Sequence, residues 1–98
     1  RTVLEENARY AVDFIRAHFA GIAVSPPQGT YMLFLDCTEY CMKSGKPIDK
    51  VIKEGWKVGV GWQDGRAFGG PCHIRMNLAS PRSRIEEAFE RLRKYVFL

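Results

Sequence analysis

The sequence predicts an α+β domain in which a small mixed or antiparallel sheet is covered on one side by helices. Apolar residues recur at helical spacing near both ends of the chain, short β-prone segments lie between them, and glycine and proline separate the segments. The predicted order is helix, short strand, strand, helix, strand, strand, helix. Because 98 residues with 46% hydrophobic content suffice for one modest core, we expect a single domain over residues 1–98.

The first predicted helix runs from Thr2 to about Ala20, and Gly21 is its stop signal. Its apolar residues fall three or four positions apart and share one face: Leu4, Ala8, Ala11, Ile15 and Phe19. Residues 22–24 are β-prone and end at residues 25–29, where two prolines and a glycine prevent regular structure from continuing. We therefore expect a tight connection before the next strand.

The continuous apolar run 31–35 predicts a central strand with both faces of the sheet covered at that position. The sequence turns polar between Thr38 and Lys46, and no regular element is predicted there. Pro47 can open a second helix, which we expect to end near Lys57. That helix carries four apolar residues on one side: Ile48, Val51, Ile52 and Trp56.

Residues 58–70 contain five glycines, which favours at most a short strand followed by a mobile or finely shaped loop. Residues 73–79 alternate cleanly and predict a half-buried strand. Its two faces divide the side chains into Ile74, Met76 and Leu78 toward a core and His73, Arg75 and Asn77 on the opposite side.

The last helix is predicted to begin with a capping box formed by Ser83 and Glu86. Acidic residues early in this helix and basic residues near its end match the sign of the helix dipole. Its apolar stripe consists of Ile85, Ala88, Phe89, Leu92 and Val96.

Composition argues against two classes of partner. No apolar run reaches the roughly 20 residues that a membrane-spanning helix needs. The net charge is +4, but the Lys and Arg residues are scattered among Asp and Glu and form no dense basic run, so we expect no nucleic-acid partner.

Three cysteines at Cys37, Cys41 and Cys72 match neither a zinc motif nor a disulfide framework, which favours reduced thiols in a cytoplasmic protein. Because the chain begins at Arg1, we expect it to be cut from a longer protein.

Arg75 is the best functional candidate, because its guanidinium lies between an imidazole and a carboxamide and can hold a carboxylate through two hydrogen bonds. An arginine on an open strand face is more often solvated or salt-bridged, so the spacing leaves both interpretations open. His73 has no nearby nucleophile and is more often structural. The remaining carboxylates fall on different predicted elements and form no acid–base pair: Asp36, Glu39, Asp49 and Asp64.

Two segments read together resemble class I/II aminotransferases of fold type I, with closest similarity to their cystathionine β-lyase-like branch. The segments are Gly29-Thr30-Tyr31-Met32-Leu33-Phe34-Leu35-Asp36 and His73-Ile74-Arg75-Met76-Asn77-Leu78-Ala79-Ser80-Pro81-Arg82. The resemblance extends to Asn7-Ala8-Arg9-Tyr10 and to the final helix, so it spans nearly the whole chain. It implies a C-terminal small domain of a pyridoxal-phosphate (PLP) enzyme.

The resemblance also implies roles for particular residues. Arg75 matches the arginine that binds the α-carboxylate of the amino-acid substrate, and Gly29, Thr30 and Tyr31 match a turn near the active-site entrance. Trp62 and Phe68 are weaker candidates. The family's Schiff-base lysine and its other cofactor-binding residues belong to a large N-terminal domain, so we expect this chain alone to be inactive and not to bind the cofactor.

The six lysines lack the family's lysine motif, and we interpret them as solvated charges. The resemblance further implies a full-length homodimer. Transamination and β-elimination stay open, as does the substrate. The alternative is a free-standing α+β ligand-binding or regulatory module, because a small sheet backed by helices hosts many functions.

Overall fold

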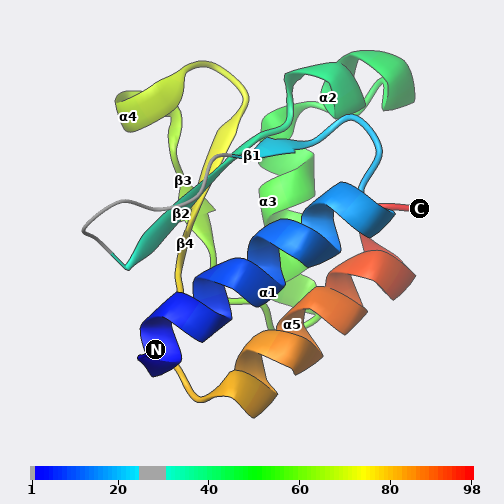
Figure 1. Cartoon of the computed structure of the whole chain (residues 1–98). Helices are drawn as coiled ribbons and strands as arrows, with labels where there is room; N and C mark the ends of the chain where they lie inside the picture. Colours follow the sequence, from blue (N-terminus) through cyan, green and yellow to red (C-terminus); the bar gives the residue numbers. More distant parts are fainter. Residues whose placement is uncertain (1, 25–30) are drawn as a thin grey trace.

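The computed structural model describes residues 2–24 and 31–98, apart from the side chain of Phe68. The α+β class is confirmed (Figure 1). The elements in chain order are α1 (Val3–His18), β1 (Ala23–Val24), β2 (Met32–Asp36), α2 (Thr38–Ser44), α3 (Ile48–Lys57), β3 (Gln63–Asp64), α4 (Arg66–Gly69), β4 (His73–Asn77) and α5 (Arg82–Tyr95). No helix within these described ranges is both long and apolar enough to span a bilayer.

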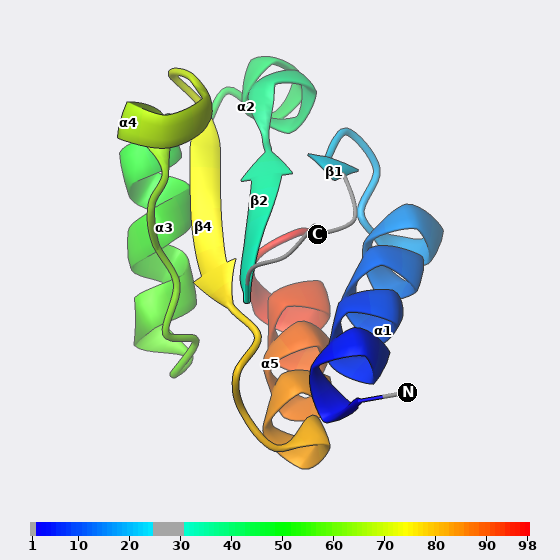
Figure 2. The same cartoon turned by 60° about the vertical axis from the view of Figure 1, so that its left-hand side comes forward.

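The four strands form one antiparallel sheet in the order β1-β2-β4-β3. Strands β2 and β4 lie side by side in its middle (Figure 2) and pair over five residues, from Met32 opposite Asn77 to Asp36 opposite His73. The central position predicted for β2 is therefore confirmed. Strands β1 and β3 are two-residue edges that add one short pairing each.

One face of the sheet is buried and the other is partly exposed. Leu33, Leu35, Ile74 and Met76 are at most 4% exposed and join residues of α1, α3 and α5 in one core. The other side, here called the open face, carries Met32, Phe34, Asp36, His73, Arg75 and Asn77. The alternation predicted for β4 is confirmed. Coverage of both faces of β2 is wrong for the described chain, because Phe34 is 36% exposed.

Helix α1 is fixed at its start and in its middle. Thr2 and Glu5 form a capping box, with Glu5 N donating to Thr2 Oγ1 at 3.1 Å and Thr2 N donating to Glu5 Oε1 at 3.3 Å. Asn7 is 0% exposed, and its Nδ2 donates to the carbonyl oxygens of Leu78 at 3.0 Å and Ser80 at 2.7 Å. The carboxamide therefore ties α1 to the chain leaving β4.

Helix α5 begins differently from the prediction. Its N-cap is Pro81, and no side chain caps it, so the capping box of Ser83 and Glu86 is wrong. Arg84 N donates to Pro81 O at 3.0 Å, which places Ser83 inside the first turn rather than before it. The predicted apolar stripe is confirmed, because Ile85, Phe89, Leu92 and Val96 are buried and Ala88 packs against the core.

Helix α3 has the predicted end and, except for Trp56, the predicted apolar face, because Ile48, Val51 and Ile52 are buried. Trp56 is 54% exposed, and its Nε1 donates to Trp62 O at 2.7 Å. The buried residue in this turn of α3 is Gly55, and a Cβ added to it would lie 2.3 Å from Trp62 Nε1. Trp62 is 1% exposed and donates its Nε1 to Ile52 O at 2.9 Å. A tryptophan from outside the helix thus fills the place predicted for Trp56.

Two short helices, α2 and α4, were not predicted. Helix α2 buries Tyr40 and Cys41 and ends at Gly45, whose φ of 76° stops the helix. Helix α4 is a single turn inside the glycine-rich stretch.

Lys46, which follows α2, is not a simple solvated charge, because its Nζ lies 3.0 Å from Glu54 Oε1 and 3.3 Å from Val96 O.

Replacing Gly55 tests the contact between α3 and Trp62. We expect Gly55→Ala to lower the free energy of unfolding by about 1 to 3 kcal/mol, because the new Cβ overlaps the indole. Urea unfolding measures this. Gly61→Ala is the matched control, since nothing lies within 4 Å of an added Cβ there. Equal stability of both variants would contradict the packing described.

Replacing Asn7 tests the link between α1 and the end of β4. Asn7→Ala leaves two carbonyl oxygens without their donor, and we expect a loss of about 1 to 3 kcal/mol in unfolding free energy. The measurement is the urea midpoint, with Arg9→Ala as an exposed control on the same helix. If both substitutions cost the same, the buried carboxamide has no special role.

Candidate functional site

Arg75 lies in the middle of the open face. It stands opposite Phe34 of β2 on one side and opposite Gln63 of β3 on the other. Strand β4 is therefore paired on both sides at this residue, and Arg75 is intermediate in exposure. A guanidinium that starts from a doubly paired strand has a fixed backbone, which favours a defined geometry toward an anion. The predicted placement of Arg75 on an open face is confirmed.

His73 and Asp36 form the end of the open face next to Arg75. They are opposite each other in the β2–β4 register, and His73 Nε2 lies 4.0 Å from Asp36 Oδ2. The backbone of Gly69 and Gly70 packs against the imidazole, since a Cβ on Gly69 would lie 2.4 Å from His73 Cδ2. The side chain of His73 is consequently only 19% exposed. This enclosure supports the structural role that the sequence favoured.

Asp36 is held as a carboxylate mainly by Thr38. Thr38 Oγ1 and Thr38 N donate to Asp36 Oδ1 at 2.6 and 3.0 Å. The side-chain hydrogen bond is the largest cause of a lowered pKa of Asp36, and the backbone hydrogen bond and the nearby His73 add to it against the cost of burial. The open face therefore ends in a negative charge on β2, two residue pairs along the β2–β4 ladder from Arg75.

Two carboxylates that the sequence left on separate elements are brought together by Arg66. Arg66 Nη2 lies 2.6 Å from Asp64 Oδ2 and 2.8 Å from Asp49 Oδ1. Hydrogen bonds from Arg66 lower the pKa of Asp64, so this carboxyl is ionised and paired. The cluster links α3, β3 and α4 and does not resemble a pair that divides acid and base work.

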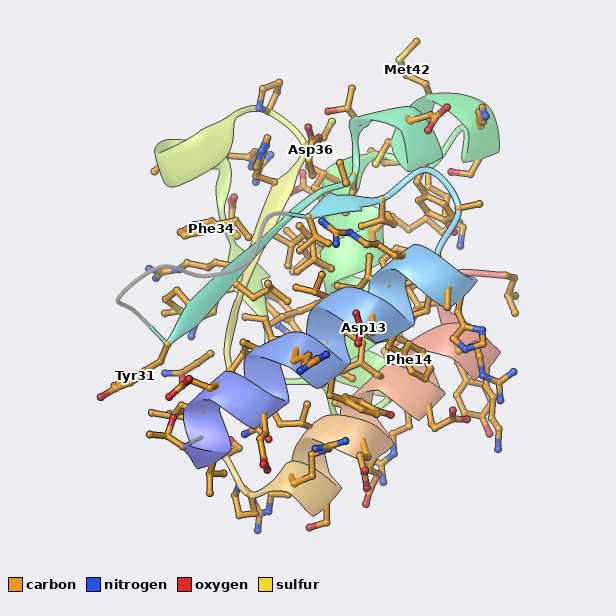
Figure 3. The ribbon with its side chains drawn as sticks, viewed as in Figure 1. Asp13, Phe14, Tyr31, Phe34, Asp36 and Met42 are labelled. Atoms are coloured by element: carbon orange, nitrogen blue, oxygen red, sulfur yellow. The ribbon has the colours of Figure 1, made fainter. Side chains whose placement is uncertain are left out.

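The weaker candidates divide into three groups. Tyr31 directly precedes β2, is 56% exposed and projects away from the ribbon (Figure 3). Gly29 and Thr30 lie outside the described residues, as does the side chain of Phe68. Trp62 is buried in the core, so the structure gives it no access to a ligand.

Two other features bear on binding. A shallow hollow of about 480 Å³ lies against the Asp36 end of the sheet and is also lined by Thr38, Glu39, Met42 and Lys43. Within residues 2–24 and 31–98, no group of three or more His, Cys, Asp or Glu residues is placed to hold a metal ion.

The Asp36–His73 pairing was missed at the sequence level, although the alternation of both strands would have placed the two residues on the same face.

Comparison with known proteins gives consistent matches over most of the chain. No protein-family profile matches. A Mycobacterium leprae protein described provisionally as a cystathionine beta-lyase is 30% identical over 91% of this chain and 25% of its own length. An aspartate aminotransferase of Bacillus subtilis is 31% identical over 78% of this chain and 20% of its own length. The chain spans about a quarter of the length of the curated relatives that it matches.

The fold is also shared with solved structures. Cystalysin from Treponema denticola, whose crystal structure contains a pyridoxal 5'-phosphate cofactor, superposes with a TM-score of 0.75. Its sequence is 30% identical, and the match covers 94% of this chain and 23% of that chain. Sequence and fold therefore point to the same group of proteins.

Removing the Thr38 hydroxyl tests the charge at the end of the open face. We expect Thr38→Val to raise the pKa of Asp36 toward its ordinary value, because the main donor to the carboxylate is lost while Thr38 N still donates. Titration of the Asp36 carboxyl by NMR measures this, with Glu39→Gln as a neighbouring control.

The effect on stability has a defined sign. A lowered pKa in the folded state adds stability above the ordinary carboxyl value of about 3.9, and this contribution disappears as the pH falls through the lowered pKa. The stability difference between wild type and Thr38→Val should therefore be present at neutral pH and shrink in acid. An unchanged Asp36 pKa in the variant would contradict the assignment.

Proposed function

Because this chain belongs to the family of PLP-dependent aminotransferases and carbon–sulfur lyases, we propose that it is the C-terminal small domain of such an enzyme and that Arg75 binds the α-carboxylate of its amino-acid substrate. The observation that carries the proposal is the position of Arg75 in the middle of the open face, between Phe34 of β2 and Gln63 of β3. A substrate pocket completed from outside this chain would lie against that face.

The chemistry of the open face supports carboxylate binding. A guanidinium donates two parallel hydrogen bonds to a carboxylate, which fixes the orientation of the bound group as well as its position. Arg75 contributes this from a strand paired on both sides, so little conformational freedom is lost when the anion binds. Phe34, opposite it on β2, offers an apolar surface for the carbon skeleton of an amino acid.

We propose that the described residues of this chain do not hold PLP by themselves. Its lysines lie on α2, α3 and α5 or on the connection before α3, and none lies on β2 or β4. PLP, when bound, supplies an electron sink for the reaction at the amino-acid Cα. We propose that the residues holding it lie in the rest of a longer polypeptide, so that these 98 residues bind the substrate carboxylate and do not catalyse alone.

Further parts of the proposal follow from the family. Tyr31, exposed at the start of β2, is a second-rank candidate for shaping substrate access, together with Gly29. We propose a cytoplasmic homodimer for the full-length enzyme. The matched relatives include a lyase and an aminotransferase, so the reaction type is a question for assay.

The decisive variant is Arg75→Ala in the full-length enzyme. Loss of a bidentate, charge-assisted contact should cost about 2 to 4 kcal/mol of transition-state binding, which is a fall of about 30- to 900-fold in kcat/KM. Steady-state kinetics with amino-acid donors and with cystathionine measure this fall and separate transamination from β-elimination. Arg84→Ala, which removes an exposed arginine from α5, is the matched control. Unchanged kinetics in Arg75→Ala would refute the assignment.

The free-standing alternative has a separate test. Sequencing the coding DNA upstream of Arg1 should reveal a few hundred in-frame codons that include a lysine motif of the family. A start codon directly before Arg1 would instead favour a small binding module.

A further inference from the structure

The three cysteines, far apart in the sequence, meet at one corner of the fold. Cys37 follows β2, Cys72 precedes β4, and Cys37 N donates to Cys72 O at 2.8 Å. This bond extends the β2–β4 ladder by one pair, so Cys37 and Cys72 stand opposite each other on the core side of the sheet. Cys41 N donates to Cys37 O at 2.9 Å, which places Cys41 one helical turn further along α2.

Within this cluster the side chains of Cys41 and Cys72 influence each other. The Sγ of Cys37 is directed to Leu35 O at 4.0 Å, on its own strand. Burial is the main cause that raises the pKa of Cys41 to about 11, and the neighbouring Cys72 thiol adds to it. All three cysteines are free thiols.

We propose that Cys41 and Cys72 are an oxidation site, which forms a disulfide when the protein meets a hydroperoxide such as hydrogen peroxide. In the first step, with hydrogen peroxide, the Cys72 thiol gives up its proton and its sulfur attacks the O–O bond, which breaks. Cys72 becomes a sulfenic acid, and the leaving hydroxide takes up the released proton as one water. In the second step the sulfur of Cys41 attacks that of Cys72, loses its proton and displaces the hydroxyl as a second water. Two thiols lose two electrons in total, and the peroxide gains them.

The order of the two steps follows from exposure. Cys37 is 0% exposed and Cys41 is 8% exposed, whereas Cys72 is partly open to solvent. The raised pKa keeps Cys41 protonated, which protects it from direct attack by peroxide. Because Cys41 lies beside Cys72, its sulfur is present at a high effective concentration next to the sulfenic acid in the second step. A disulfide here would tie α2 to the residue directly before His73.

Peptide mapping after peroxide treatment tests the site, on the protein expressed with the sequence that flanks these 98 residues in its gene. Cleavage after Glu39 separates Cys37 from Cys41, and cleavage after Arg66 and Arg75 isolates Cys72. We expect a non-reduced peptide pair joining Cys41 to Cys72, lighter by two hydrogen atoms and separated again by dithiothreitol. A link through Cys37, or alkylation of all three thiols after peroxide, would overturn the proposal.

Variants identify the roles of the two residues. Cys37→Ser should keep the Cys41–Cys72 link, and Cys72→Ser should abolish it. Cys41→Ala should leave a sulfenic acid on Cys72 that dimedone labels, because the resolving thiol is absent. A dimedone adduct on Cys41 in Cys72→Ser, at the rate seen for Cys72, would contradict the assigned order. The wild-type peptide map decides the question even if a variant does not fold.

Discussion

The antiparallel pairing of β2 with β4 is the constraint on which the rest of the molecule depends. Because side chains alternate along both strands, one register sends Leu33, Leu35, Ile74 and Met76 to the core and leaves the residues opposite them on the open face. A shift by one residue would exchange the two sets. The same register that buries the core therefore brings Arg75 to the uncovered side.

Connections on either side of this pairing hold it in place. Asn7 binds the carbonyl oxygens of Leu78 and Ser80 just after β4, and Trp62 fills the space over Gly55 at the edge of the sheet. A buried polar group lowers stability unless it is hydrogen-bonded. Such groups therefore favour the one packing of helices and strands in which all of their hydrogen bonds form. Arg75 thus lies on a strand that is paired on both sides and tied at its C-terminal end, which suits a residue that must hold an anion in one orientation.

Sequence patterns were reliable where one periodicity applied over many residues. The apolar stripe of α5, that of α1 except for Leu4, and the alternation of β4 follow from such patterns and are confirmed. The errors fall where a short local signal competed with packing. Trp56 matched the helical spacing, but Trp62 occupies the buried space beside Gly55, and Pro81 rather than Ser83 is the N-cap of the last helix. Helices α2 and α4 are one or two turns long, too short for periodicity to reveal.

The sequence by itself determined the α+β class, the order of the long elements and the strand face that carries Arg75, because these depend on the period of apolar residues and on residue type. Only the tertiary structure decided which side chains meet across the chain. The pairing of His73 with Asp36, the bridge from Arg66 to Asp49 and the meeting of three cysteines join residues that lie many positions apart. Such contacts depend on strand register and helix packing, which no local pattern encodes.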